Sequence, residues 1–170
     1  IDGDNFDDLE VAWRFSTVNF GSIPDFNYQT TPLMVDGVLY ATAGSRRDVV
    51  ALDAATGELL WVYRIDEGDR AANAIRRLSG RGVAYWTDGS DDERIYVVTI
   101  GYQLVALDAE TGRPVPTFGT DGIVDLKLNN DQFIDPLSGE IGWNGAPIVA
   151  RDVVVVGASH RAGSVPPSRE

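Results

Sequence analysis

Short apolar runs separated by turn residues fill the stretch from residue 31 to residue 61. Asp36-Gly37 is a dipeptide typical of tight β-hairpins, and Ala54–Gly57 has the composition of a second turn. Apolar segments joined by turns in this way predict neighbouring strands of one antiparallel sheet. The expected strands are Leu33–Val35, Val38–Ala41, Val49–Leu52 and Glu58–Trp61.

The same pattern returns further along the chain. The phrase ALDAATG begins at Ala51, and the phrase ALDAETG begins at Ala106. A period of about 50 residues with four short strands per repeat is typical of propeller blades. We therefore predict an all-β propeller of four-stranded antiparallel blades and prefer it to generic hairpins in a β-sandwich. Further strands are expected at Leu9–Phe15 (the end of an earlier unit), Gly82–Tyr85, Ile95–Thr99 and Leu104–Leu107, and in a third unit at 146–159 around a turn at Arg151-Asp152.

The repeated phrase also carries a packing signal. Thr56-Gly57 and Thr111-Gly112 each close a turn in which glycine allows positive φ. We expect the small side chains of Ala51 and Ala106 to leave room for an aromatic ring from a neighbouring unit. Trp61 is such a ring, and its indole N–H would need an acceptor once it is buried.

Two prolines follow the second copy of the phrase, in Pro114-Val115-Pro116. Proline cannot donate to a strand ladder. We therefore expect the outer strand of this unit to be cut short and to be followed by an excursion over Thr117–Trp143.

Composition narrows the function classes. The 170 residues are 44% hydrophobic, which is enough for a packed core, and the net charge is −12. An acidic chain without a general basic surface is a poor partner for nucleic acid and for anionic lipid. The chain has no cysteine, so thiolate metal sites and cysteine nucleophiles are excluded. It begins with Ile1 and shows no signal-peptide pattern, so we expect a processed or excised piece whose targeting information lies upstream.

The repeated units resemble the tryptophan-docking motif of quinoprotein dehydrogenases, which use pyrroloquinoline quinone (PQQ). RGVAYW (81–86) and GRPVPTFGTDGIVDL (112–126) look most like the sugar and polyol branch of that family, which also lacks the vicinal cysteine pair of methanol dehydrogenases. The other segments that carry the resemblance are LEVAW (9–13), TPLMVDGVLY (31–40), VVALDAATGELLW (49–61), LVALDAETG (104–112) and APIVARDVVVVGAS (146–159).

The resemblance implies an eight-bladed propeller with PQQ over its central channel. At about 45–55 residues per blade, 170 residues supply about three blades, and three blades cannot close a ring. The remaining blades are therefore expected partners of this chain. We divide residues 1–170 into the end of a closing blade (1–30), two blades (31–79 and 80–143) and the start of a next blade (144–170).

Four residues are candidate cofactor ligands by the resemblance. Arg81 matches the family's arginine before Gly-Leu/Val-Ala-Tyr, and its guanidinium can pair with a carboxylate or quinone oxygen of PQQ. Gln29 stands where relatives usually carry a glutamate that contacts the cofactor, and Asn144 stands where they often have a threonine. Ser159 matches a serine that contacts the cofactor. Strand-entry or strand-end capping remains the alternative for Gln29, Asn144 and Ser159.

Other charged residues give weaker signals. A solvated loop accounts as well as a binding site does for Arg70, Arg76 and Arg77. His160 is the only histidine, so we expect a loop residue near the channel and no metal cluster. The acidic runs at 2–10 and 88–93 lack the spacing of a calcium loop. Ala162 replaces a metal-binding glutamate of methanol dehydrogenases.

These inferences lead to three functional hypotheses. The first is part of a periplasmic, or periplasm-facing membrane-associated, PQQ-dependent dehydrogenase that oxidises a sugar, polyol or other alcohol. By the resemblance, hydride would pass from the alcohol to PQQ with the help of a bound Ca²⁺-type ion, and a quinone or cytochrome would then accept the electrons. By the resemblance, the catalytic base and most metal ligands lie beyond Glu170, so the chain alone should be inactive. The second is a non-catalytic propeller scaffold similar to outer-membrane assembly lipoproteins, and the third is a degenerate pocket for another anion.

Overall fold

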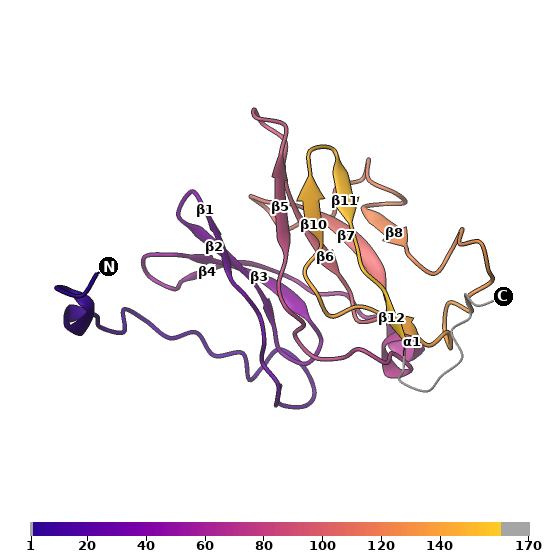
Figure 1. Cartoon of the computed structure of the whole chain (residues 1–170), viewed down its shortest axis with the longest axis horizontal. Coiled ribbons are helices and arrows are strands. Elements are labelled where there is room, and N and C mark those ends of the chain that lie inside the picture. The colour runs from indigo at the N-terminus through magenta and orange to yellow at the C-terminus, as the bar shows by residue number, and fades with distance from the viewer. Residues whose placement is uncertain (1, 161–170) are drawn as a thin grey trace.

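Two four-stranded antiparallel sheets dominate the computed structural model, which describes residues 2–160 (Figure 1). In both sheets, each strand pairs with the strand that precedes it in the chain. The first sheet contains β1 (Leu33–Val35), β2 (Val38–Ala43), β3 (Asp48–Asp53) and β4 (Leu59–Tyr63). The second contains β5 (Ala84–Thr87), β6 (Glu93–Val98), β7 (Gln103–Asp108) and β8 (Ile123–Asp125).

Two smaller antiparallel pairs follow the second sheet. The first is the hairpin of β10 (Ile148–Ala150) and β11 (Val153–Val155), and it lies beside β5 (Figure 1). The second joins β9 (Ile141–Gly142) to β12 (Ser159–His160). Two short helices complete the described part of the chain, the 3-10 helix η1 (Phe6–Asp8) and α1 (Gly68–Ala72), and neither is long and apolar enough to cross a membrane.

The predicted turns form as expected. Asp36 and Gly37 both have positive φ, at 46° and 81°, as a two-residue hairpin turn of the primed type requires. In the turn after β3, the Asp53 carboxylate accepts a hydrogen bond from the Thr56 N–H at 2.7 Å. Asp108 and Thr111 repeat this contact, also at 2.7 Å. The turn between the third and fourth strands of each unit is therefore set by its aspartate, threonine and glycine.

Both faces of the central strands are buried, because each sheet packs between two neighbours. Side chains alternate between the two faces of a strand. In β3, Val49 and Ala51 face the second sheet, while Val50 and Leu52 face the N-terminal segment. In β7, Val105 and Leu107 face the first sheet, while Leu104 and Ala106 face the third unit. The sheets therefore form a row of layers with a hydrophobic core in each gap.

Tryptophan rings connect successive units. The indole N–H of Trp13 donates to the Ala54 carbonyl at 3.1 Å, and that of Trp61 donates to the Ala109 carbonyl at 3.0 Å. Each ring lies over the glycine of the turn it reaches. A Cβ added to Gly57 would lie 2.6 Å from Trp13 Cδ2, and one added to Gly112 would lie 2.5 Å from Trp61 Cδ2.

The predicted position of these rings, over the small side chains of Ala51 and Ala106, is therefore wrong. Ala51 and Ala106 point into the strand-face clusters on the side away from the incoming rings. The space for each ring is instead made by the missing side chain of Gly57 or Gly112. This place also offers the indole N–H a backbone carbonyl of the turn as its acceptor.

Two of the predicted strand positions differ from the structure. Residues Leu9–Phe15 form no strand, because no described segment pairs with them, although Trp13 and Phe15 still pack on the first sheet. In the second unit, Pro114 makes only an isolated bridge to Leu107. The fourth strand, β8, forms later, inside the predicted excursion, after a turn in which Gly122 N–H donates to the Phe118 carbonyl.

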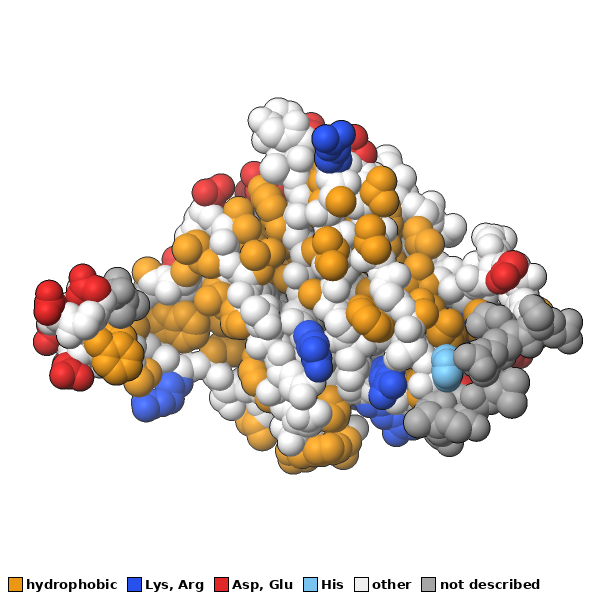
Figure 2. Space-filling model, in the orientation of Figure 1, with side chains coloured by type: hydrophobic (Ala, Val, Ile, Leu, Met, Phe, Trp, Pro, Cys, Tyr) orange, Lys and Arg blue, Asp and Glu red, His pale blue; other side chains and the backbone are white. Residues whose placement is uncertain are grey.

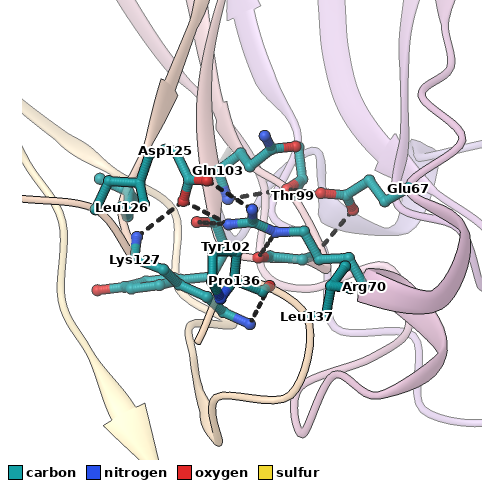
Figure 3. Close-up of polar contacts among 12 residues, drawn as sticks. Glu67, Arg70, Thr99, Tyr102, Gln103, Asp125, Leu126, Lys127, Pro136 and Leu137 are labelled. Carbon is teal, nitrogen blue, oxygen red and sulfur yellow. Dashed lines mark hydrogen bonds and ion pairs between the residues drawn. The ribbon is translucent and has the colours of Figure 1, made fainter. Parts of the chain in front are cut away.

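A solvated loop was one of the two alternatives for Arg70, and the structure excludes it for this residue. Arg70 lies on α1, is 8% exposed, and forms two hydrogen bonds of 2.6 Å with the Asp125 carboxylate on β8 (Figure 3). Its Nε atom also donates to the Gly101 carbonyl at 2.6 Å. Glu67, the N-cap of α1, accepts from the Thr99 hydroxyl at 2.7 Å, so this turn of helix is fixed to the second sheet at its N-cap and at its middle residue.

We predict that Gly112→Ala in the full-length protein lowers the free energy of unfolding by about 3 kcal/mol, because the new methyl group overlaps the Trp61 ring and the residue has positive φ. Gly37→Ala is the matched control, since Gly37 also has positive φ but has no atom within 4 Å of an added Cβ. This control should cost only about 1 kcal/mol. Thermal or denaturant unfolding measures both. Equal losses in the two variants would show that the ring does not press on Gly112.

Arg70→Ala should destabilise the protein by about 2–3 kcal/mol, because it leaves the Asp125 carboxylate half-buried and unpaired. The more exposed pair of Arg94 and Asp92 provides the control, and Arg94→Ala should cost about 1 kcal/mol or less. A loss for Arg70→Ala no larger than that of the control would contradict this account.

The same pair predicts a dependence of stability on pH. Burial alone would raise the pKa of Asp125, but hydrogen bonds from Arg70 and from the Lys127 N–H outweigh it and lower that pKa. A folded-state pKa below the unfolded one gives stability that is present above about pH 4 and is lost as the pH falls through the depressed value. The Arg70→Ala variant should therefore lose less stability than wild type between pH 4 and pH 2. Parallel acid unfolding curves for the two proteins would contradict this.

Candidate functional site

Three of the four predicted cofactor residues line one pocket. Arg81, Asn144 and Ser159 surround a space of about 360 Å³. They come from three separate segments, before β5, before β10 and on β12. The remaining lining residues are Arg76, Trp143 and Gly145.

The backbone of Arg81 is held on both sides. Its N–H donates to the Asn144 carbonyl at 2.8 Å, and its carbonyl accepts from the Thr31 N–H at 3.0 Å. The next residue, Gly82, forms a parallel bridge with Thr31, and a Cβ there would lie 2.7 Å from the Thr31 carbonyl oxygen. Only glycine fits that place, so the Arg-Gly sequence fixes where the exposed Arg81 side chain begins.

Ser159 is tied to Arg76, for which the local sequence pattern is only a weak signal. The Arg76 Nε atom donates to the Ser159 hydroxyl at 2.9 Å, and that hydroxyl donates to the Gly142 carbonyl at 3.0 Å. Arg76 is thus a half-buried member of the pocket, and the solvated-loop interpretation is wrong for it. Because the Ser159 proton is already used, Ser159 can offer a ligand only a lone pair.

Asn144 is held by Arg47, a residue that the sequence analysis missed. The Arg47 Nη2 atom donates to Asn144 Oδ1 at 2.6 Å. Arg47 is 6% exposed, and burial lowers its pKa to about 10, while the charges of Glu67 and Asp25 partly oppose this. It therefore remains a cation at neutral pH. No local pattern marks Arg47, because its partners come from segments far along the chain.

Gln29 is not part of this pocket. Its side chain is exposed, and it lies two residues before Thr31, which bonds to Arg81. Its predicted contact with the cofactor stays a prediction. The remaining arginine of the cluster, Arg77, is exposed and bonds to the Ala72 and Ala74 carbonyls.

The pocket has the chemistry that a planar polyanion needs. Two guanidinium groups, an amide and an indole ring line it, and none of the carboxylates in the described part of the chain does. The Trp143 ring is confined by glycines, since a Cβ on either Gly145 or Gly157 would lie 2.6 Å from it. Its Nε1 atom is buried and has no hydrogen-bond partner among the described residues. The residues present therefore fit PQQ, a tricarboxylate with an ortho-quinone.

A metal site is a separate question. Among residues 2–160, no group of three or more His, Asp and Glu side chains could hold a metal ion. His160 was expected in a loop, but it lies on β12, where it pairs with Ile141. Ala162, the predicted departure from the metal-binding glutamate, lies outside the described residues.

Comparisons with known proteins give one consistent result. The dehydrogenase subunit of the alcohol dehydrogenase (quinone) of Gluconobacter oxydans (strain 621H) is 32% identical over 165 residues, which covers 92% of this chain and 18% of the relative. The glycerol dehydrogenase large subunit of Gluconobacter thailandicus is 30% identical, with 92% and 22% covered. The chain thus spans about a fifth of the length of these relatives.

Solved structures agree with the sequence relatives. The quinohemoprotein alcohol dehydrogenase from Comamonas testosteroni matches with a TM-score of 0.60 and 27% identity over 81% of this chain and 18% of that one. A europium-containing methanol dehydrogenase matches with a TM-score of 0.65 and 27% identity over 94% of this chain and 24% of that one. The family model for the β-propeller domain of PQQ glucose/ethanol/alcohol dehydrogenases matches residues 1–168. The chain therefore belongs to the family of PQQ-dependent β-propeller dehydrogenases.

Proposed function

We propose that this chain is part of a PQQ-dependent dehydrogenase that oxidises a sugar, polyol or other alcohol. The observation that carries the proposal is a pocket lined by Arg76 and Arg81 and, among residues 2–160, by no carboxylate, in a chain of net charge −12. A cationic pocket in an acidic protein indicates an anionic ligand. Relatives named as alcohol, glycerol and glucose dehydrogenases support the reaction class.

The pocket residues divide the work of holding the cofactor. Arg81 has an exposed side chain on a fixed backbone, so it can turn its guanidinium to a carboxylate or quinone oxygen. Arg76 is held at Nε by Ser159, which leaves its terminal nitrogens for a second anionic group. Cations placed beside a quinone oxygen stabilise negative charge as it develops there. PQQ, when bound, supplies the acceptor for the hydride of the alcohol.

The rest of the reaction belongs to parts of the protein beyond this chain. We assign the general base and most ligands of a Ca²⁺-type ion to the remaining blades, and we nominate no aspartate of this chain as the base. Electron transfer to a quinone or a cytochrome fits the names of the relatives, which include quinone-dependent and quinohemoprotein enzymes. A periplasmic, or periplasm-facing membrane-associated, location follows the same family reasoning, and cell fractionation tests it.

A non-catalytic scaffold is the second candidate function. Two observations favour it: Gln29 is outside the pocket, and the Ser159 proton is used within the protein. A pocket for some other anion is the third. The scaffold and the other-anion hypotheses both predict that PQQ does not bind selectively. Titration of the protein with PQQ therefore separates these two hypotheses from the dehydrogenase hypothesis.

Arg81→Ala in the full-length apoprotein should weaken PQQ binding about 10- to 100-fold, since one charge-assisted hydrogen bond is worth about 1.5–3 kcal/mol. Quenching of tryptophan fluorescence measures the dissociation constant. The control is Arg113→Ala, an exposed arginine outside the pocket, which should bind PQQ as wild type does. Equal affinities for the wild type and Arg81→Ala would remove Arg81 from the site.

Removal of divalent metal should abolish dye-linked alcohol oxidation by the full-length protein with PQQ, because the proposed ion acts as a Lewis acid on the quinone. Adding Ca²⁺ back should restore the activity. The measurement is the initial rate with an artificial dye and a panel of sugars, polyols and simple alcohols, before and after chelation. Full activity in a sample shown to be metal-free would contradict the proposed role of the ion.

A further inference from the structure

Arg47 is bonded in an unusual way for a buried cation. Its guanidinium donates six hydrogen bonds of 2.6–3.3 Å, and every acceptor is a neutral oxygen. No ion pair among the described residues includes it. The acceptors are the carbonyls of Leu78, Val98, Thr99, Arg76 and Trp143, and Oδ1 of Asn144.

Three of these acceptors belong to residues that line the pocket. Arg47 bonds to the Trp143 carbonyl at 2.8 Å, to the Arg76 carbonyl at 3.3 Å and to the Asn144 side chain at 2.6 Å. The guanidinium also packs on Gly80, where an added Cβ would lie 2.9 Å from Arg47 Nε and 3.2 Å from the Asn144 carbonyl oxygen. One side chain from the β2–β3 connection thus fixes two of the three segments that form the pocket, those of Arg76 and of Trp143 and Asn144.

The contact with Asn144 also determines which way the carboxamide faces. A guanidinium has only donors, so it holds the amide oxygen and repels the amide N–H₂. With Oδ1 bound to Arg47, the Nδ2 atom makes no hydrogen bond within the described chain. The amide therefore presents a donor, and not an acceptor, to the pocket that Asn144 lines. A donor suits a carboxylate or quinone oxygen, as do Arg76 and Arg81.

We propose that Arg47 is a positioning residue, which turns the Asn144 amide N–H₂ toward an anionic cofactor and places a third positive charge behind the pocket. This inference rests on the proposed function, since PQQ is the ligand in question. Arg47 does not itself line the pocket, so it acts through Asn144 and through the backbone of Arg76 and Trp143.

The test is a double-mutant cycle on the full-length apoprotein, with PQQ affinity measured by equilibrium dialysis and folding checked by thermal unfolding. Arg47→Lys keeps the positive charge but loses the planar set of guanidinium N–H donors, and Asn144→Ala removes the amide. Each should weaken PQQ binding about tenfold, as expected for one lost hydrogen bond. The PQQ affinity of the double variant should be at most about threefold lower than that of the weaker-binding single variant, because the two residues act as one unit. Arg46→Lys, the exposed neighbour, should bind PQQ as wild type does.

Asn144→Asp gives a test that does not disturb Arg47. A carboxylate would pair with the Arg47 guanidinium, so thermal stability should be kept, while the loss of the donor and the added negative charge should weaken PQQ binding at least about tenfold. If Arg47→Lys does not fold, this variant decides the question.

The outcomes separate this proposal from the proposed function. If wild type does not bind PQQ, the proposed function fails and the role of Arg47 fails with it. If wild type binds PQQ but the effects of Arg47→Lys and Asn144→Ala multiply to about 100-fold, only the positioning role is overturned. The positioning role is likewise overturned if Asn144→Asp binds PQQ as tightly as wild type.

Discussion

The contact between an indole ring of one unit and a turn glycine of the next sets the geometry of this protein. Trp13 reaches the turn at Gly57, and Trp61 reaches the turn at Gly112, with nearly the same hydrogen-bond length to a turn carbonyl. Because the ring fills the place of a missing side chain, each sheet meets its neighbour at one offset only. The apolar faces can then close on each other in every gap, which is why the central strands are buried on both sides.

This arrangement also explains where the charges lie. The chain has a net charge of −12, yet Arg47 and Arg70 are among its buried residues. Arg70 is neutralised by Asp125, and it serves to fix α1 to the second sheet (Figure 3). Within residues 2–160, Arg47 has only neutral acceptors, and it lies behind the pocket of Arg76 and Arg81. The acidic surface and the cationic pocket are thus separate features, and only the second indicates a ligand.

Figure 2 shows hydrophobic side chains over the region of β10 and β11, where Ile148, Val153 and Val155 are exposed.

Local sequence patterns correctly predicted the turns, which depend on neighbouring residues. They failed for features that depend on residues far along the chain. The hairpin at Asp36-Gly37 and the paired turns after β3 and β7 were predicted, because aspartate, threonine and glycine set them within four residues. Leu9–Phe15 was predicted as the last strand of an earlier unit, but no described segment pairs with it. Arg81, Asn144 and Ser159 were found through the family resemblance. Arg47 was missed because its main acceptors are backbone carbonyls. Every residue has a backbone carbonyl, so the sequence does not show which of them Arg47 contacts.

The central claim is that docked sheets bring three distant segments together as the wall of a PQQ site. A crystal structure of the full-length protein with PQQ tests this most directly. The account predicts that the carboxylates or quinone oxygens of PQQ lie within hydrogen-bond distance of Arg81, with Arg76 and Asn144 beside them. PQQ bound at another place, or a side chain from another blade filling this pocket, would contradict it.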